Sequence, residues 1–264
     1  MRFRILLACL LLSCLLISSS LFAAEWKKEY KVSASPTLQV ESNDASIEVR
    51  GGAVSAISAV VTTNGWEIGP SGVKITEWQN GDQVYLQVKI PNQHWMVNLG
   101  KRSVKVEVAV PQKTRVQATT SDGSVRLDGT KAGAVLKTSD GSIHVSGFDG
   151  DLQARTSDGS IDADGRFTAL DLQTSDGQIK ADIATGSKIS GPWNLRTSDG
   201  SVHLRVPADI AFELDASTGD GSINSDLTIQ SEEKARNRLR GKVNGGGPTL
   251  HVHTSDGSIH IGKS

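Results

Sequence analysis

A four-residue motif, Thr-Ser-Asp-Gly, recurs along the chain and constrains its fold more than any other feature. A variant, Thr-Gly-Asp-Gly, begins at Thr218, and a weaker copy surrounds Asp44. The first four aspartates are 18 residues apart, and the later gaps are 23, 21 and 36 residues. A period of this length indicates a repeat architecture whose units stack on one another. The aspartates of the motif and its variant are Asp122, Asp140, Asp158, Asp176, Asp199, Asp220 and Asp256.

Apolar and polar residues alternate on both sides of each motif. Leu170 and Leu172 precede Asp176, and Ile143 and Val145 follow Asp140, with polar residues between them. This period of two predicts a short strand on each side of the motif, with one face toward a core. The threonine of the motif shares the inward parity. We therefore expect a stack of threonines at the edge of the core.

The segment between the two strands is typical of a tight turn. Glycine adopts a positive φ without a Cβ penalty, and aspartate can accept hydrogen bonds from amides just downstream of it. Two short strands and two turns account for the 18-residue period. Each unit is then either one coil of a β-solenoid or one hairpin of an antiparallel meander. We favour the β-solenoid, because its two walls cover each other's apolar faces.

Residues 25–111 carry longer alternating segments than the repeats do. We expect strands at 84–90 and 104–110 and a turn at 80–82. Since the Asp44 copy of the motif lies within it, we interpret this region as a capping portion of the repeat domain.

The predicted fold is therefore all-β, with a single β-solenoid domain over residues 25–264. Residues 25–111 form its N-terminal capping portion, and residues 112–264 form its repeat coils. The charged, helix-tolerant segment Ser231–Val243 is expected to interrupt the coils as a surface excursion.

Residues 1–24 have the organisation of a secretory signal peptide. Arg2 and Arg4 precede an apolar run, which ends in small residues, so we expect cleavage after Ala23 or Ala24. The apolar run is shorter than the roughly 20 residues that span a bilayer. We therefore predict an exported protein of the periplasm, outer envelope or extracellular space, with no transmembrane span in the mature chain.

Both cysteines, Cys9 and Cys14, lie within this leader. The mature chain would then contain no disulfide and no catalytic thiol. Leu-Leu-Ser-Cys at Cys14 resembles a lipobox, so a lipid anchor on Cys14 is the alternative fate of the leader.

The charge of the chain excludes one class of partner. The formal net charge is -1 at pH 7, whereas nucleic-acid binding requires a clustered excess of Lys and Arg. We expect no nucleic-acid partner.

The regular aspartates suggest calcium as an alternative, because some repeat proteins bind Ca²⁺ between their turns. Those repeats have paired glycines and a second liganding turn, which this chain lacks. Turn formation explains the aspartates, and a local hydrogen bond to each carboxylate would hold it in place. We predict no metal and no cofactor.

Three histidines share the last unit. A hairpin would set His253 opposite His260 on the outer face, beside His251, which would give a zinc-like constellation. Exposed histidines on a terminal strand are the simpler interpretation, and we expect no metal site here.

Two further groups of side chains are candidates for binding. The basic run of the excursion indicates a solvated face, with anion contact as the alternative. Three tryptophans could stack on sugar rings if they are exposed, although packing in the core or cap is the expected role. The basic residues are Arg236, Arg238, Arg240 and Lys242, and the tryptophans are Trp66, Trp78 and Trp95.

No residue stands out as catalytic. Polysaccharide-active enzymes need paired carboxylates at a fixed separation, or a metal with a base, in a cleft. The carboxylates of this chain recur once per unit, and nothing distinguishes one unit from the others. We predict that the protein is not an enzyme.

The Thr-Ser-Asp-Gly-Ser-Ile units, together with Val110-Pro111, Val206-Pro207 and a Gly-Gly-Gly-Pro segment before the last unit, resemble a known family. From Leu38 to Ile261 the chain is similar to the bacterial putative-adhesin domain family of unknown function. The resemblance implies a secreted or envelope-associated, β-solenoid-like domain, and it supplies no catalytic residues.

The predicted function is that of a non-enzymatic, secreted or cell-envelope domain that presents an adhesin-like surface to a protein or glycan partner at the envelope. The first alternative is a structural envelope protein that associates with itself through the open ends of its coils. A calcium-binding repeat and a polysaccharide-active β-helix enzyme are the remaining alternatives.

Overall fold

The computed structural model describes residues 23–91, 102–191 and 193–264, and this part of the chain is all β, with no helix. Its strands form one open, 21-stranded sheet. The predicted signal peptide falls almost entirely on residues 1–22, which lie outside the described residues, as does Trp95.

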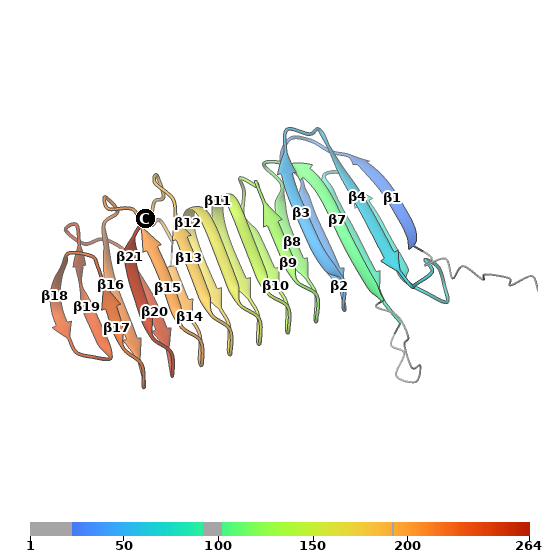
Figure 1. Cartoon of the computed structure of the whole chain (residues 1–264). Helices are drawn as coiled ribbons and strands as arrows, with labels where there is room; N and C mark the ends of the chain where they lie inside the picture. The colour runs from blue at the N-terminus through green and yellow to red at the C-terminus, as the bar shows by residue number, and fades with distance from the viewer. Residues whose placement is uncertain (1–22, 92–101, 192) are drawn as a thin grey trace, which may run out of the picture.

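The strands follow one another in two rows, which we call the first wall and the second wall (Figure 1). β11 (Ile143–Arg155) and β12 (Ile161–Gln173) pass from the second wall to the first, with shifts of register on the way. In order of pairing, the first wall consists of β5 (Lys74–Asn80), β6 (Gln83–Lys89), β2 (Thr37–Ser42), β8 (Arg115–Thr119), β10 (Ala134–Lys137), the ends of β11 and β12, β14 (Trp193–Arg196), β20 (Thr249–Thr254), β16 (Phe212–Thr218), β19 (Arg238–Val243) and β18 (Ile229–Lys234). The second wall consists of β1 (Ala23–Lys31), β4 (Ala56–Asn64), β7 (Ser103–Pro111), β3 (Ser46–Gly52), β9 (Val125–Asp128), the beginnings of β11 and β12, β13 (Ile179–Ile183), β15 (Val202–Val206), β21 (Ile259–Lys263) and β17 (Ile223–Ser225).

Neighbouring repeats pair in parallel, with equivalent residues side by side. Leu152 of β11 is the partner of Leu170 of β12, and Ile143 is the partner of Ile161. Both pairs are separated by the 18-residue period. Antiparallel pairing occurs at the ends, between β1, β4 and β7, between β5 and β6, and between β16, β19 and β18. An antiparallel meander of successive units is therefore wrong for the repeat region.

The order of units in space differs from their order in the sequence at both ends. β20 and β21 lie between the β14–β15 unit and the β16–β17 unit. At the other end, β2 and β3 lie between the β6–β7 unit and the β8–β9 unit. The C-terminus is consequently found inside the row of strands (Figure 1). The gap of 36 residues before Asp256 arises because the chain first forms β16 to β19 at the outer end of the stack and then returns to form β20 and β21.

The core lies between the walls and is built by the predicted alternation. Its residues are mainly Val, Leu, Ile and Ala, and Phe167 packs between Phe148 and Trp193, with ring centroids 5.8 and 6.5 Å away. The threonine stack is confirmed, because the motif threonines are all buried. They are Thr120, Thr138, Thr156, Thr174, Thr197, Thr218 and Thr254.

The segment Ser231–Val243 is a structural part of the sheet, which corrects the prediction of a surface excursion. Most of it belongs to β18 and β19, which form an antiparallel hairpin beside β16. Leu239 and Val243 are buried, while Arg238, Arg240 and Lys242, which alternate with the buried positions, are exposed. Alternation with a period of two was present here but was obscured by the high charge of the segment.

The predicted turn at residues 80–82, at the other end of the stack, is confirmed. β5 and β6 are joined at residues 80–82, where Gly81 has a φ of 56°. Contacts across the two walls then close this end of the core. The hydroxyl of buried Tyr30 on β1 donates to Glu77 on β5 at 3.3 Å, and the amide of Gln79 donates to the carbonyl of Lys31 at 2.7 Å.

Candidate functional site

The Thr-Ser-Asp-Gly turns form a continuous ladder along one corner of the molecule. The hydroxyl of Thr156 donates to the carbonyls of Ser139 and Gly141 in the preceding unit, both at 2.9 Å. The amides of Ser157 and Asp158 donate to the carbonyl of Ser139 at 2.9 and 3.0 Å. The same pattern recurs from unit to unit, so the turns hold neighbouring units together.

Glycine is required in these turns by close approach, whereas the sequence interpretation assigned it to a positive φ. The turn glycines are absent from the described residues with positive φ. Instead, a Cβ on Gly159 would lie 1.9 Å from the carbonyl oxygen of Gly141. Ala45 takes the glycine position in the first of these turns, and among the described residues no turn of this type precedes it.

The aspartate side chains of the ladder are exposed to solvent. In the described part of the chain, no carboxylate from Asp122 to Asp256 in the ladder accepts a hydrogen bond, so the predicted local bond to the carboxylate is wrong. The amides just downstream of the aspartate have other acceptors, since that of Gly159 donates to the hydroxyl of Thr156 and that of Ser160 to the hydroxyl of Ser142, both at 3.3 Å. Asp44 begins the row, and partial desolvation, together with the charge of Asp122, raises its pKa.

The histidines of the last unit are separated by the fold, which corrects the predicted constellation. His253 lies on β20 in the first wall, where its Nδ1 is 3.0 Å from the hydroxyl of Ser217. His260 lies on β21 in the second wall. The Thr-Ser-Asp-Gly turn joins strands of opposite walls, and so it cannot set these two side chains opposite each other on one face.

The second wall instead brings His260 beside His203, a pairing that sequence reasoning missed. The two imidazoles are stacked with centroids 4.9 Å apart and planes 14° apart. Both residues occupy the same position after the motif aspartate. The signal was therefore present, but adjacency of the two units depends on the insertion of β21 next to β15.

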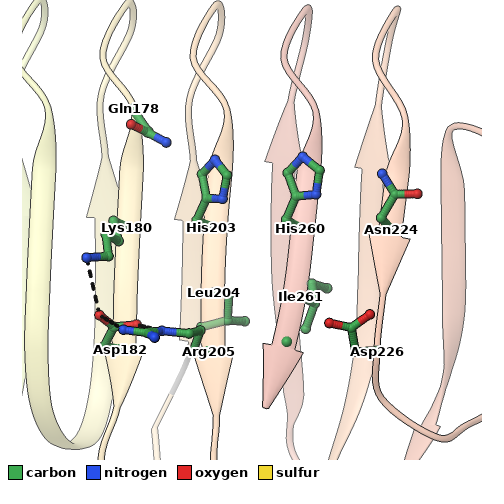
Figure 2. A pocket seen from close by; sticks show the side chains of 11 residues that line it. Gln178, Lys180, Asp182, His203, Leu204, Arg205, Asn224, Asp226, His260 and Ile261 are labelled. Carbon is green, nitrogen blue, oxygen red and sulfur yellow. Dashed lines mark hydrogen bonds and ion pairs between the residues drawn. The ribbon is translucent and has the colours of Figure 1, made fainter. Parts of the chain in front are cut away.

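These histidines lie in an open groove of about 350 Å³ on the outer face of the second wall (Figure 2). On one side, Asp182 accepts hydrogen bonds from both Nε and an Nη of Arg205 and lies 3.6 Å from the Nζ of Lys180. Hydrogen bonds from Arg205 lower the pKa of Asp182, and they outweigh burial, which raises it. Desolvation, followed by the charges of His260 and Lys180, lowers the pKa of His203.

The basic run of the β18–β19 hairpin is partly neutralised. Arg238 lies 3.1 Å from Glu233 and 3.9 Å from Asp215, and Arg240 lies 3.5 Å from Asp215. These exposed ion pairs fit the predicted solvated face.

One of the candidate tryptophans is exposed in a manner suited to binding. Trp78 on edge strand β5 has 47% of its surface exposed, and its ring stacks on Tyr85 of β6, with centroids 5.4 Å and planes 15° apart. We call this pair the aromatic platform. Trp66 differs, because it packs partly buried against the core, with Arg102 4.6 Å from its ring centroid.

A network of polar side chains continues from the aromatic platform along the first wall. Glu41 accepts hydrogen bonds from the Tyr85 hydroxyl at 2.9 Å, from Gln39 at 2.8 Å and from Gln87 at 3.3 Å. Burial opposes ionisation of Glu41, but these three hydrogen bonds and the charge of Lys89 prevail and lower its pKa. The carboxylate is therefore ionised at neutral pH and fixes the orientation of Tyr85.

Over residues 23–91, 102–191 and 193–264, no group of three or more His, Cys, Asp or Glu side chains is arranged to hold a metal ion. Within the same ranges, no helix of the length and hydropathy needed to span a membrane occurs.

Comparison with known families gives one match. The model of the family described as Toastrack DUF4097 matches residues 114–262, which is more than half of the chain. No curated protein matches the sequence.

Solved structures of low sequence identity resemble this one. A protein from Clostridium sporogenes described as a putative cell adhesion protein is 12% identical, with a TM-score of 0.42, over 92% of this chain and 100% of that chain. A putative adhesin from Bacteroides fragilis is 10% identical, with a TM-score of 0.40, over 91% and 97%. A putative lipid binding protein from Parabacteroides distasonis is 11% identical, with a TM-score of 0.35, over 90% and 96%.

Proposed function

The chain belongs to the Toastrack DUF4097 family, a family of unknown function, and from this premise we propose that it is an exported, non-enzymatic β-solenoid that binds a glycan of the cell envelope. The aromatic platform of Trp78 and Tyr85 is the binding surface. The exposure of Trp78 at the end of a polar wall is the observation that most supports this function.

The geometry of the platform suits a sugar ring. Tyr85 covers one face of Trp78, and β5 is the last strand of its wall in the described part of the chain, so no other described strand covers the opposite face. The C–H faces of a pyranose pack against an aromatic face of this kind. Beside the rings, Gln39, Gln87 and Glu41 carry hydrogen-bonding groups toward which sugar hydroxyls can be directed. The ligand class is therefore a neutral pyranose polymer.

The β-solenoid assignment has its own support. Equivalent residues of successive units pair in parallel in both walls, as do Leu170 with Trp193 and Ile161 with Ile179. Each unit contributes one strand to each wall. We assign residues 25–264 to a single domain, with residues 25–111 as its N-terminal capping portion and residues 112–264 as its repeat coils.

A role without catalysis is supported by the state of the carboxylate at the platform. A general acid for glycoside cleavage needs a raised pKa. Glu41 has a lowered pKa and three hydrogen-bond donors. This carboxylate serves to orient Tyr85 and Gln87.

The edge strands favour a binding domain over a self-associating structural protein. β1 has the exposed residues Lys27, Lys28 and Glu29, and β18 has Glu232, Glu233 and Lys234. Charged side chains on an edge oppose the addition of another strand. β17, at the remaining end of the second wall, has only three residues.

Removing the aromatic face of Trp78 tests the binding proposal. The wild-type protein is expected to bind at least one of cellohexaose and chitohexaose in isothermal titration calorimetry. Trp78→Ala should weaken that binding at least tenfold, which corresponds to about 1.4 kcal/mol, while Trp78→Phe should retain part of it. Stacking is lost in the first variant and reduced in the second.

Val54→Ala is the matched control, because Val54 is an exposed apolar residue outside the platform, with 45% of its surface accessible. Its affinity should equal that of the wild type. The proposal would be contradicted if Trp78→Ala bound the oligosaccharide as tightly as the wild type does, or if the wild type bound neither cellohexaose nor chitohexaose.

Export is tested by the mass of the protein recovered from the envelope fraction of expressing cells. We expect the chain to begin at Ala24 or Glu25, because small residues precede both bonds. Either cleavage retains the pairing of β1 with β4 from Glu25 to Lys31. A chain that begins at a lipidated Cys14 would support the lipid-anchored alternative, and an uncleaved chain in the cytoplasmic fraction would contradict export.

A further inference from the structure

The stacked pair of His203 and His260 has the features of a small metal-binding site. The two residues are direct partners on the parallel strands β15 and β21. Their rings lie side by side at the same level of the groove (Figure 2), with centroids 4.9 Å apart. Imidazole nitrogens are the common ligands of Zn²⁺, Cu²⁺ and Ni²⁺. Two of them on adjacent strands can act as a chelate.

Neither imidazole is occupied by another contact. Within the described residues, no hydrogen bond or ion pair involves a ring nitrogen of His203 or His260, in contrast to His144, which lies 3.2 Å from Asp162, and His253, which contacts Ser217. The ring nitrogens of this pair are therefore available to a ligand from solvent.

The neighbouring charges leave room for a cation. Lys180, the partner of His203 on the other side, is directed to Asp182, which also binds Arg205 (Figure 2). On the opposite side, Asn224 is the partner of His260. The two cations near the pair are thus held by a carboxylate, and the neighbour on the opposite side is uncharged.

The hollow shape of the groove has a local cause. Gly262 is the strand partner of Arg205, and it lacks the side chain that would fill the space toward Asp226. A Cβ on Gly262 would lie 3.6 Å from a carboxylate oxygen of Asp226. Asp226 has no ion-pair partner among the described residues. An exposed carboxylate therefore lines the same groove as the two imidazoles.

We propose that His203 and His260 together bind one divalent transition-metal ion, with water completing its coordination. Tetrahedral zinc with bonds of about 2.0–2.1 Å places two nitrogens roughly 3.4 Å apart. The second torsion of a histidine side chain is soft, so the nearly parallel rings can tilt toward each other to reach this separation. A bound metal would link β15 to β21 and so fasten the C-terminal unit to the stack.

Titration of the tag-free protein with CuCl₂, NiCl₂ and ZnCl₂ tests this site. One ion per chain is expected, with Cu²⁺ bound most tightly, following the usual order of stability. Each of His203→Asn and His260→Asn should weaken binding at least tenfold, and the double variant should lose little more than either single one, because one imidazole alone cannot chelate. Saturating metal should also raise the melting temperature of the wild type, and a chelator should reverse the increase.

His144→Asn is the matched control, since His144 occupies the same outward position on the second wall but stands alone between Arg126 and Asp162. His251→Asn with His253→Asn controls for the other wall. In the wild type, Zn²⁺ should shift the imidazole NMR signals of His203 and His260 selectively. The proposal is overturned if no saturable binding occurs at millimolar metal, if the control variants lose as much affinity, or if the shifted signals belong to other histidines.

Discussion

Replacement of Gly159 by alanine is expected to lower the free energy of unfolding by at least about 3 kcal/mol, the upper end of the range for overpacking. The added Cβ would lie 1.9 Å from the carbonyl oxygen of Gly141 and 2.5 Å from its carbonyl carbon. That carbonyl also accepts the hydroxyl of Thr156, so it cannot move away without breaking a contact between units. For a chain of this size the melting temperature should fall by about 6–12 °C.

Gly52→Ala is the matched control for this substitution. Gly52 also lies in a repeat-type unit and has no positive φ, and the nearest atom to an added Cβ is Cγ1 of Val54 at 4.0 Å. This variant should melt within a few degrees of the wild type, and it can be measured by the same circular-dichroism scan. Equal stability of Gly159→Ala and Gly52→Ala would show that turn spacing does not depend on the absence of a side chain.

Thr156→Val is expected to destabilise the protein by about 1–3 kcal/mol. Valine has nearly the same shape, but it lacks the hydroxyl that donates to Ser139 and Gly141 and accepts a hydrogen bond from the amide of Gly159 at 3.3 Å. The threonine is buried, so water cannot replace the lost partners. The urea concentration at the midpoint of unfolding should decrease, while the slope of the unfolding free energy against urea concentration should stay the same.

For Thr130, a second buried threonine, replacement by valine is expected not to destabilise the protein. The side-chain oxygen of Thr130 has no hydrogen-bond partner among the described residues, and the residue is only 1% exposed. Its replacement removes an unpaired polar group from the core, so stability should be unchanged or increase by about 1 kcal/mol. If both valine variants are destabilised equally, the hydrogen bonds of the ladder are not what distinguishes Thr156.

The candidate sites could be predicted from the sequence only where they depend on local neighbours. Trp78 was named as a sugar-stacking candidate, but its exposure follows from the position of β5 at the end of the first wall. Tyr85 and Glu41 were missed, because they meet through the parallel pairing of β2 with β6. The His203–His260 pair was missed for the same reason, since 57 residues separate its members in the sequence.

The hairpin of β18 and β19 shows how composition can hide a pattern. Leu239, Gly241 and Val243 alternate with Arg238, Arg240 and Lys242, which is the period of a strand. The high charge of the segment suggested a surface excursion. Pairing with β16 decides the outcome, because it gives the apolar side of the segment a core to cover.

The sequence alone determined the all-β class, the 18-residue unit, the alternation of inward and outward residues and the buried threonine stack. These features are local or identical from unit to unit, and so they can be read from spacing and polarity. Only the tertiary structure decided which units are neighbours, because the insertion of β20–β21 and β2–β3 into the row depends on contacts between residues far apart in the chain. The same contacts explain the turn glycines, whose missing side chain matters only when another turn lies against it.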